Sequence, residues 1–552
     1  MQVLVGGVIW LAGSVVLLAL GVPHGRLVSL VAAYGLMTPL LVRWLRRSRE
    51  PGSEPIAMPV ISTRTFVATV LVIAVAVLAI AHFWDRGILW GDEDCYRQQA
   101  RIFETGHPWI DAPAPTSADP VQSAHELKFL HHIIHDGHWF TKYPPAWPAV
   151  LAIGDLAHLR WMVNPLLAVL ALCIVFSLGK RELGLRDPRL PVLMLVASPF
   201  FFMTAASQMS HMLGFVCCAG ATLCFLRAMR TDTTTGIAGA LALIGVCAFV
   251  RPFTAFCTAV ALVPFALPAL FSRGRRGAAI VAMAVGLGSL TVAAMALYNH
   301  FYTGHYGQSL YALYGDGKLH ELSVSPSLII ANLKDALRWS LQDTAIFTWP
   351  LMFALAVYAL WADRERRYQH SVIIVVFIAL GLGNLINTEQ SSSRFGDRYL
   401  FEGIAGPALL AARGVELAIE RWRVPTRIAG RTLGALTVAG LVLAVPLVVP
   451  TLQEIRPYTQ VHTAVDALPA DGSLVFFPVT DSFTGDRFDL NATDTTRAPH
   501  MFLVDPGPDR RAAVAAAEHR SRWIVLGYDD VRREPVVLAR GLAQVSAAPS
   551  AP

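Results

Sequence analysis

Apolar runs long enough to span a membrane recur along this chain of 552 residues. An α-helix needs about 20 mostly apolar residues to cross the hydrocarbon core of a bilayer. Hydrophobic residues make up 54% of the sequence and charged residues only 15%, against about 25% in an average soluble protein. The runs therefore predict a polytopic membrane protein, mainly α, built as a transmembrane helical bundle. The candidate spans are 2–22, 27–45, 65–84, 161–179, 190–206, 211–228, 236–250, 254–271, 277–298, 345–361, 370–387, 399–418 and 431–450.

Basic residues fall in short clusters between these runs, and they orient the predicted helices. Cytoplasmic loops of membrane proteins are enriched in Lys and Arg. If the cluster at 43–49 is cytoplasmic, the alternation of about thirteen spans places five further clusters there. The N-terminus is then cytoplasmic and the C-terminus extracytoplasmic, and the net charge of +6 is explained without nucleic acid as a partner. The five further clusters are 180–189, 227–230, 272–277, 363–367 and 420–427.

The apolar stretch at 146–159 would reverse every later loop if it crossed the membrane. The basic clusters would then face outward, against the usual distribution of Lys and Arg. We therefore expect a short helix in or dipping into the outer interface. A true span is the alternative.

Polar segments divide the chain into three predicted parts. Residues 1–60 hold two N-terminal spans and a basic cytoplasmic linker, and residues 61–451 form the main transmembrane domain. That domain includes a large first extracytoplasmic loop at 85–145. Residues 452–552 are expected to fold as a small extracytoplasmic α/β domain.

The expectation of a folded tail rests on three of its segments. The apolar segments 473–479 and 522–527 are typical of buried strands, and 509–521 is typical of an amphipathic helix. Two strands and a helix are enough to predict a small domain docked on the outer face of the bundle.

Three consecutive acids, Asp92, Glu93 and Asp94, follow the third predicted span. A helix-like segment comes next, so the acids stand at a helix N-terminus, where the helix dipole favours negative charge. Helix capping at an interface is one interpretation. The other is a general base, because a carboxyl group at an apolar boundary can have a pKa suited to proton abstraction.

A single lysine, Lys142, lies between aromatic residues just before Pro144 and Pro145. The two prolines restrict the backbone that enters the next helix. A lysine whose stem lies in an aromatic belt is the ordinary explanation. A cation that holds a lipid-borne phosphate is the functional one.

Five histidines lie between 125 and 138. On a helix, His131 and His135 would share one face, an arrangement that can bind a divalent metal. No carboxylate is spaced with them as in the zinc-protease pattern, so hydrogen-bonding histidines at the interface are the better interpretation.

Later polar motifs add cations and a histidine to the same predicted membrane face. They are His211 in QMSH, Arg251 in VRPF, and Arg394 and Arg398 in SSSRFGDRYLFE. Each has an ordinary explanation as a turn, a helix end or a polar loop. Together with Asp92, Glu93 and Lys142 they combine a base with several cations, which suits a reaction that expels an anionic leaving group.

At these residues the chain resembles the GT-C superfamily of polyprenyl-phosphate-sugar-dependent glycosyltransferases. Bacterial relatives of protein O-mannosyltransferases and lipid A aminoarabinose transferases (glycosyltransferase family 39) are the most similar group within it. The resemblance covers roughly residues 65–530. The third acid, Asp94, departs from the pattern and leaves open which carboxylate is the base. The matching pieces are Asp92-Glu93, Lys142-Tyr143-Pro144-Pro145, 198–211, Arg251-Pro252 and 396–414.

The resemblance implies a hexosyl- or pentosyltransferase of the bacterial plasma (inner) membrane, with a polyprenyl-phosphate sugar as donor and no required cofactor. An acceptor hydroxyl on a glycan, lipid or protein would be deprotonated by Asp92, with Glu93 as its helper. The hydroxyl would then attack the anomeric carbon with inversion and displace the lipid phosphate. The residues expected to bind the donor are Lys142, Tyr143, His211, Arg251, Arg394, Arg398 and Tyr399.

A polytopic transporter or lipid flippase is the alternative function. Transporters usually carry ionisable residues in the middle of spans and interrupted helices in two related halves. In this sequence the charged residues gather at one face and no second half is visible, which favours the enzyme.

Reporter fusions test the predicted topology. Fusions at Arg186 and Arg366 should report the cytoplasm, because basic clusters are retained on that side. Fusions at Gly106 and Ser482 should report the outside. An extracytoplasmic signal at Arg186 would instead mean that 146–159 crosses the membrane.

Overall fold

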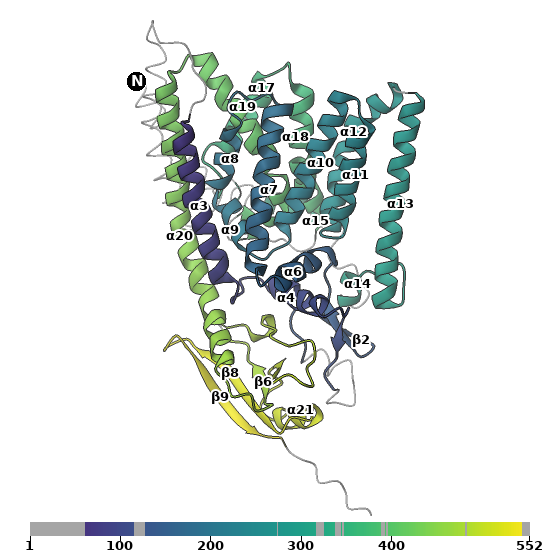
Figure 1. The fold of residues 1–552 in the computed structure, drawn as a ribbon, viewed down its shortest axis with the longest axis vertical. Coiled ribbons are helices and arrows are strands. Elements are labelled where there is room, and N and C mark those ends of the chain that lie inside the picture. The colour runs from purple at the N-terminus through teal and green to yellow at the C-terminus, as the bar shows by residue number, and fades with distance from the viewer. Residues whose placement is uncertain are drawn as a thin grey trace, which may run out of the picture.

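The computed structural model describes residues 61–114, 127–272, 274–315, 325–336, 344, 347–387, 392–393, 396–480 and 483–543. The predicted spans 2–22 and 27–45 lie outside the described residues, and so does Arg394. Figure 1 shows a bundle of helices with a small α/β domain at one end, so the predicted fold class is confirmed.

Every predicted span from residue 65 onward overlaps a helix or a pair of helices. Among the described residues, six helical segments are long and apolar enough to cross a membrane. They are α3 (Thr63–Trp84), the segment Arg160–Glu182 around α7 (Val163–Ser177), α10 (His211–Thr231), α12 (Pro252–Ser272), α13 (Arg275–Thr303) and the segment Arg367–Ile386 around α18 (Arg367–Gly383). Other helices account for the remaining predicted spans: α11 (Thr234–Ala248), α17 (Met352–Ala362), α19 (Ala405–Trp422) and part of α20 (Thr426–Asp466).

The predicted span 190–206 is broken in the middle. It consists of α8 (Arg189–Val196) and α9 (Pro199–Ala206), which meet at an angle of 69°. Pro199 has no N–H with which to continue the helical hydrogen bonds. The Ser198 hydroxyl donates to the Met194 carbonyl at 2.6 Å and accepts from the Trp349 N–H at 2.8 Å, which satisfies polar groups at the break.

The apolar stretch 146–159 does not cross the bundle. It forms α6 (Ala146–Leu156), whose 11 residues extend about 16 Å, roughly half of a hydrocarbon core. α6 lies across the end of the bundle and packs against α4 (Gly91–Glu104) (Figure 1). The predicted short helix is confirmed, and its place in the outer membrane interface instead of a true span stays a prediction.

Basic clusters meet at the opposite end of the bundle. Arg186 forms an ion pair with Glu420 at 2.8 Å, and Arg230 with Glu182 at 3.0 Å. α20 runs from this end to the other, where it enters the α/β domain (Figure 1). The clusters at 180–189, 227–230 and 420–427 therefore lie at one end, as the topology requires, and the assignment of that end to the cytoplasm stays a prediction. The cluster at 43–49 lies outside the described residues.

The α/β domain contains a mixed four-stranded sheet in the order β7-β6-β8-β9. β6 is parallel to β7 and β8, whereas β8 and β9 are antiparallel. The predicted strands and helix of the tail are confirmed. The predicted boundary at 452 falls inside the continuous helix α20. The elements are β6 (Leu474–Phe477), β7 (Met501–Val504), α21 (Arg511–Ala517), β8 (Arg522–Asp529) and β9 (Glu534–Leu542).

The histidine-rich part of the first outer loop is a β-hairpin, so the predicted helical face of His131 and His135 is wrong. β2 (His132–His135) pairs with β3 (His138–Thr141), and β1 (Ile110–Asp111) pairs with the other side of β3. Asp136 and Gly137 both have positive φ, at 50° and 76°. An Asp-Gly pair with positive φ at both residues strongly favours a two-residue hairpin turn. The segment therefore forms a hairpin, although its histidines are spaced as on one face of a helix.

The first outer loop and the α/β domain share one hydrophobic core. Ile102, Phe129 and Trp139 of the loop belong to the same buried cluster as Phe476 and Leu503 of the sheet. Burial of this apolar surface stabilises the docking of the domain on the loop. The tail therefore packs with the segment 85–145 into one unit at this end of the bundle.

A buried polar contact adds to this docking. The Asp489 N–H donates to Asp94 Oδ2 at 2.7 Å, and Arg101 donates to the Asp489 carbonyl at 2.7 Å. Burial and the charge of Asp489, against the lowering effect of Arg97, raise the pKa of Asp94 to about 8. Burial also raises the pKa of Asp489, to about 6.

These raised pKa values predict that docking weakens as pH rises. Between the unfolded and folded pKa values the folded carboxyl groups bind more protons than the unfolded chain, so the free energy of unfolding falls with increasing pH. We expect a loss of at least about 1 kcal/mol between pH 5 and pH 8, because one pKa unit corresponds to about 1.4 kcal/mol. Hydrogen exchange of the β6 and β8 amides, corrected for its intrinsic pH dependence, measures this loss.

Asp94→Asn is the matched variant, because its amide oxygen still accepts from the Asp489 N–H. Its loss of protection between pH 5 and pH 8 should be clearly smaller than that of the wild type. An identical pH dependence in both proteins would contradict the role given to Asp94.

Candidate active site

The three acids at the start of α4 point to three different places. Successive residues on a helix are rotated by about 100°, so neighbouring side chains cannot share one direction. Asp92 lines a cavity, Glu93 contacts the ends of α3 and α9, and Asp94 contacts the α/β domain. The position of α4 therefore determines where the carboxylate of Asp92 lies.

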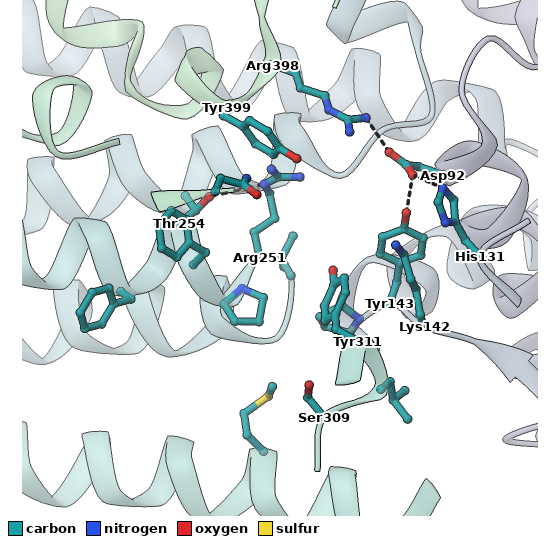
Figure 2. A pocket seen from close by; sticks show the side chains of 18 of the residues that line it. Asp92, His131, Lys142, Tyr143, Arg251, Thr254, Ser309, Tyr311, Arg398 and Tyr399 are labelled. Carbon is teal, nitrogen blue, oxygen red and sulfur yellow. Dashed lines mark hydrogen bonds and ion pairs between the residues drawn. The ribbon is translucent and has the colours of Figure 1, made fainter. Parts of the chain in front are cut away.

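A cavity of about 530 Å³ lies beside the N-terminus of α4 (Figure 2). This volume is within the usual range of small-molecule sites, about 300–1,000 Å³. The structure brings six of the predicted site residues together on its walls: Asp92, Lys142, Tyr143, Arg251, Arg398 and Tyr399. Polar side chains that were not among the predicted site residues also line it, among them Tyr96, His131, Thr254, Ser309 and Tyr311.

Asp92 is held as a carboxylate by three neighbours (Figure 2). Arg398 Nη1 lies 2.6 Å from Asp92 Oδ2, the Tyr143 hydroxyl donates to Oδ1, and His131 Nε2 lies 3.4 Å from Oδ1. Burial would raise the pKa of Asp92, but the guanidinium of Arg398 and its other partners outweigh burial and hold that pKa below its ordinary value. Asp92 is therefore ionised in the absence of ligand.

The cations of the cavity lie against tyrosine rings. Lys142 Nζ is 4.6 Å from the centroid of the Tyr314 ring and 5.5 Å from that of Tyr311. The guanidinium of Arg398 is 5.4 Å from the Tyr399 ring, and that of Arg251 is 5.9 Å from the same ring. Aromatic faces attract cations, so the rings fix the positive groups in place. Three cations from three separate segments make this cavity suited to an anion.

Two predicted site residues do not line the cavity. The Glu93 carboxylate accepts from the Trp84 indole, the Leu89 N–H and the Gln208 N–H, each at 3.0 Å. These bonds anchor α4 to α3 and to the chain just after α9. Because Glu93 does not line the cavity, its position does not support the predicted role as a catalytic helper. His211 lies behind the wall, where its Nδ1 is 2.9 Å from Glu402 Oε1.

His131 is a site residue that the sequence offered only as part of the histidine cluster. Its φ of 66° is unusual for a residue other than glycine and turns the chain at the start of the hairpin beside Asp92. Burial, with the charge of Lys142, lowers the pKa of His131 to about 4, so the imidazole is neutral. In the sequence, the Asp136-Gly137 pair indicates the hairpin that positions His131. Among the described residues, no group of three His, Cys, Asp or Glu side chains is arranged to hold a metal ion.

A solved structure shares the arrangement of most of this chain. ArnT from Cupriavidus metallidurans bound to undecaprenyl phosphate superimposes with a TM-score of 0.53 over 85% of this chain and 94% of that chain, at 14% sequence identity. This protein has the GT-C fold. The fold that Asp92-Glu93, Lys142-Tyr143-Pro144-Pro145 and the other matching segments implied is thereby confirmed.

Two further solved structures extend the comparison. The apo state of the same ArnT gives a TM-score of 0.52 at 14% identity, over 85% of this chain and 93% of that chain. The Archaeoglobus fulgidus oligosaccharyltransferase in complex with Zn and sulfate gives 0.48 at 13% identity, over 82% and 68%. No protein-family model and no curated protein matches the sequence.

Glu93→Ala should destabilise the protein. It leaves two buried N–H donors and one part-buried N–H donor without their acceptor, and each buried loss costs about 1–3 kcal/mol. We therefore expect a clearly lower midpoint of thermal unfolding in detergent. Asp111→Ala, which removes an exposed carboxylate of the same loop, is the control and should leave the midpoint unchanged. A Glu93→Ala protein of wild-type stability that has lost its activity would return Glu93 to a catalytic role.

Proposed function

We propose that this protein is a membrane glycosyltransferase that moves a sugar from a polyprenyl-phosphate donor to an acceptor hydroxyl on the extracytoplasmic face. One observation carries the proposal: an ionised Asp92 and the cations Lys142, Arg251 and Arg398 line one cavity at the end of the bundle. The ArnT structure with the same fold is bound to undecaprenyl phosphate, a lipid of the donor's class.

The walls of the cavity suit a donor that is half lipid. Phe256, Met295 and Leu380 line it together with the cations. Phe256 belongs to α12 and is 63% exposed on a helix that is apolar enough to span the membrane. An isoprenoid chain therefore has an apolar path to the bilayer, whereas a soluble nucleotide sugar would gain nothing from these walls.

The cations act on the leaving group. The phosphodiester of the donor carries one negative charge, and polyprenyl phosphate carries a second one after the bond to the sugar breaks. Lys142 and Arg251 would bind the phosphate and stabilise the additional charge as it develops. Stabilisation that grows toward the transition state is what accelerates the reaction.

Asp92 serves as the general base. The acceptor hydroxyl gives its proton to the carboxylate, its oxygen attacks the anomeric carbon, and the bond to the phosphate oxygen breaks with its electron pair on that oxygen. Attack opposite the leaving group inverts the configuration. A donor phosphate near Arg398 would compete for the guanidinium that lowers the pKa of Asp92, so the base becomes stronger when the donor is bound.

A polytopic transporter or lipid flippase is the second candidate, and the broken helix pair α8–α9 favours it. All eight residues of α9 are buried and most are apolar, and the charged groups of the cavity lie elsewhere. The break is therefore better explained by packing inside the bundle than by a transport path.

Two substitutions separate the base from the phosphate site. Asp92→Asn keeps the shape of the side chain but cannot accept the proton, so sugar transfer should fall by about 10²–10⁴-fold while donor binding survives. Lys142→Ala should weaken donor binding, because the phosphate loses a cation in a poorly solvated cavity. Purified protein with polyprenyl-phosphate sugars and a mixture of acceptors provides both measurements.

Lys180→Ala, an exposed lysine at the other end of the bundle, is the control and should bind donor normally. Wild-type turnover in Asp92→Asn would refute its role as base. Wild-type donor affinity in Lys142→Ala would remove it from the phosphate site.

A further inference from the structure

One edge of the Arg251 guanidinium is fixed before any ligand arrives. Arg251 Nε lies 2.8 Å from Glu402 Oε1, a charge-assisted contact. Nη1 makes only long contacts, 3.4 Å each, with the Ser210 hydroxyl and with His211 Nε2. Nη2 has no hydrogen-bond partner in the described part of the chain. The Nη edge is therefore available to an anion in the cavity.

Glu402 is itself outside the cavity and fully enclosed. Its side chain is 0% exposed, and its Oε1 receives both Arg251 and His211 Nδ1, the latter at 2.9 Å. Its Oε2 is buried without a hydrogen-bond partner among the described residues. An ionised carboxylate in such a place is costly unless a charged partner compensates it. The contact with Arg251 supplies that compensation.

The neighbouring helix is shaped to admit this carboxylate. A Cβ atom at Gly214 of α10 would lie 2.9 Å from Glu402 Cγ, closer than real side chains approach. Glycine at this position thus makes room for Glu402 against α10. Glu402 therefore has its own space in the packing, an ion pair with Arg251 and a hydrogen-bond contact with His211.

Glu402 and Arg398 belong to the same short helical segment, η5 (Arg398–Gly403). Arg398 reaches the cavity directly and contacts Asp92 at 2.6 Å. Glu402 reaches it indirectly, because it holds Arg251 from the side away from the cavity. One six-residue segment therefore sets the positions of two of the three cations.

We propose that Glu402 is a positioning residue that holds Arg251 with its Nη edge toward the donor phosphate. This inference rests on the proposed function and adds a residue that contacts no substrate. An arginine side chain loses considerable rotamer freedom when it is ordered. Because Glu402 orders Arg251 beforehand, less of that entropy is lost when the phosphate binds.

Glu402→Gln tests the inference, with undecaprenyl phosphate as the probe and undecaprenol as its neutral counterpart. The amide keeps the size of the side chain but removes the charge that fixes Arg251. Undecaprenyl phosphate should bind about tenfold more weakly, which corresponds to about 1.4 kcal/mol. Undecaprenol binding should not change, because it has no phosphate to meet Arg251.

Glu416→Gln is the matched control. Glu416 is an equally buried glutamate that pairs with Arg413 at 3.2 Å and accepts from the Asp187 N–H at 3.0 Å, next to the basic clusters. The same substitution there should leave the affinity for undecaprenyl phosphate unchanged. Equal weakening in both variants would reduce the effect to general destabilisation and overturn the inference.

Gly214→Ala provides a second variant that leaves every charge in place. Its methyl group would displace Glu402 and with it Arg251, so undecaprenyl phosphate should again bind more weakly than it does to the wild type, while undecaprenol binding should not change. Wild-type affinity in both Glu402→Gln and Gly214→Ala would refute the positioning role. If the wild-type protein did not bind undecaprenyl phosphate at all, the proposed function would fail instead, and the two failures are distinguishable.

Discussion

The site depends on the anchoring of α4, a helix that is buried along most of its length at the end of a membrane bundle. Its first turn carries three carboxylates, and such charges are costly in a poorly solvated place unless each has partners. Glu93 bonds to α3 and to Gln208, two residues after α9, and Asp94 bonds to the α/β domain. With two acids used for attachment, the third, Asp92, is held at the cavity without freedom to turn away.

The bilayer explains why so many charged groups from distant segments meet here. Ionisable side chains are expensive within the hydrocarbon core, so they collect at helix ends. Lys142 precedes α6, Arg251 precedes α12, and Arg398 begins η5 between α18 and α19. Each cation is thus supplied by a connection between helices, and the packing of the bundle brings those connections to one cavity.

Much of this was predictable because membrane insertion acts on local sequence. Hydropathy located the helices, and the basic clusters sorted their ends, which placed Asp92, Lys142, Arg251 and Arg398 on one face before any contact was known. The contacts of individual side chains were not predictable in this way. The sequence offered Glu93 as the catalytic helper of Asp92, and only the positions of Trp84 and Gln208 show that its carboxylate anchors α4.

His211 and Glu402, at the other wall of the cavity, are a second case in which side-chain contacts were not predictable from the sequence. Glu402 follows Arg398 and Tyr399, which line the cavity, yet it contacts His211 and lies behind Arg251. Asp92–Arg398 and Glu402–Arg251 are two carboxylate–guanidinium pairs with different surroundings. The first pair faces the cavity with both members, so an anion can separate it and leave Asp92 a stronger base. In the second pair only Arg251 lines the cavity, so an anion can bind to it without displacing Glu402. One pair is thereby suited to respond to the donor and the other to hold it.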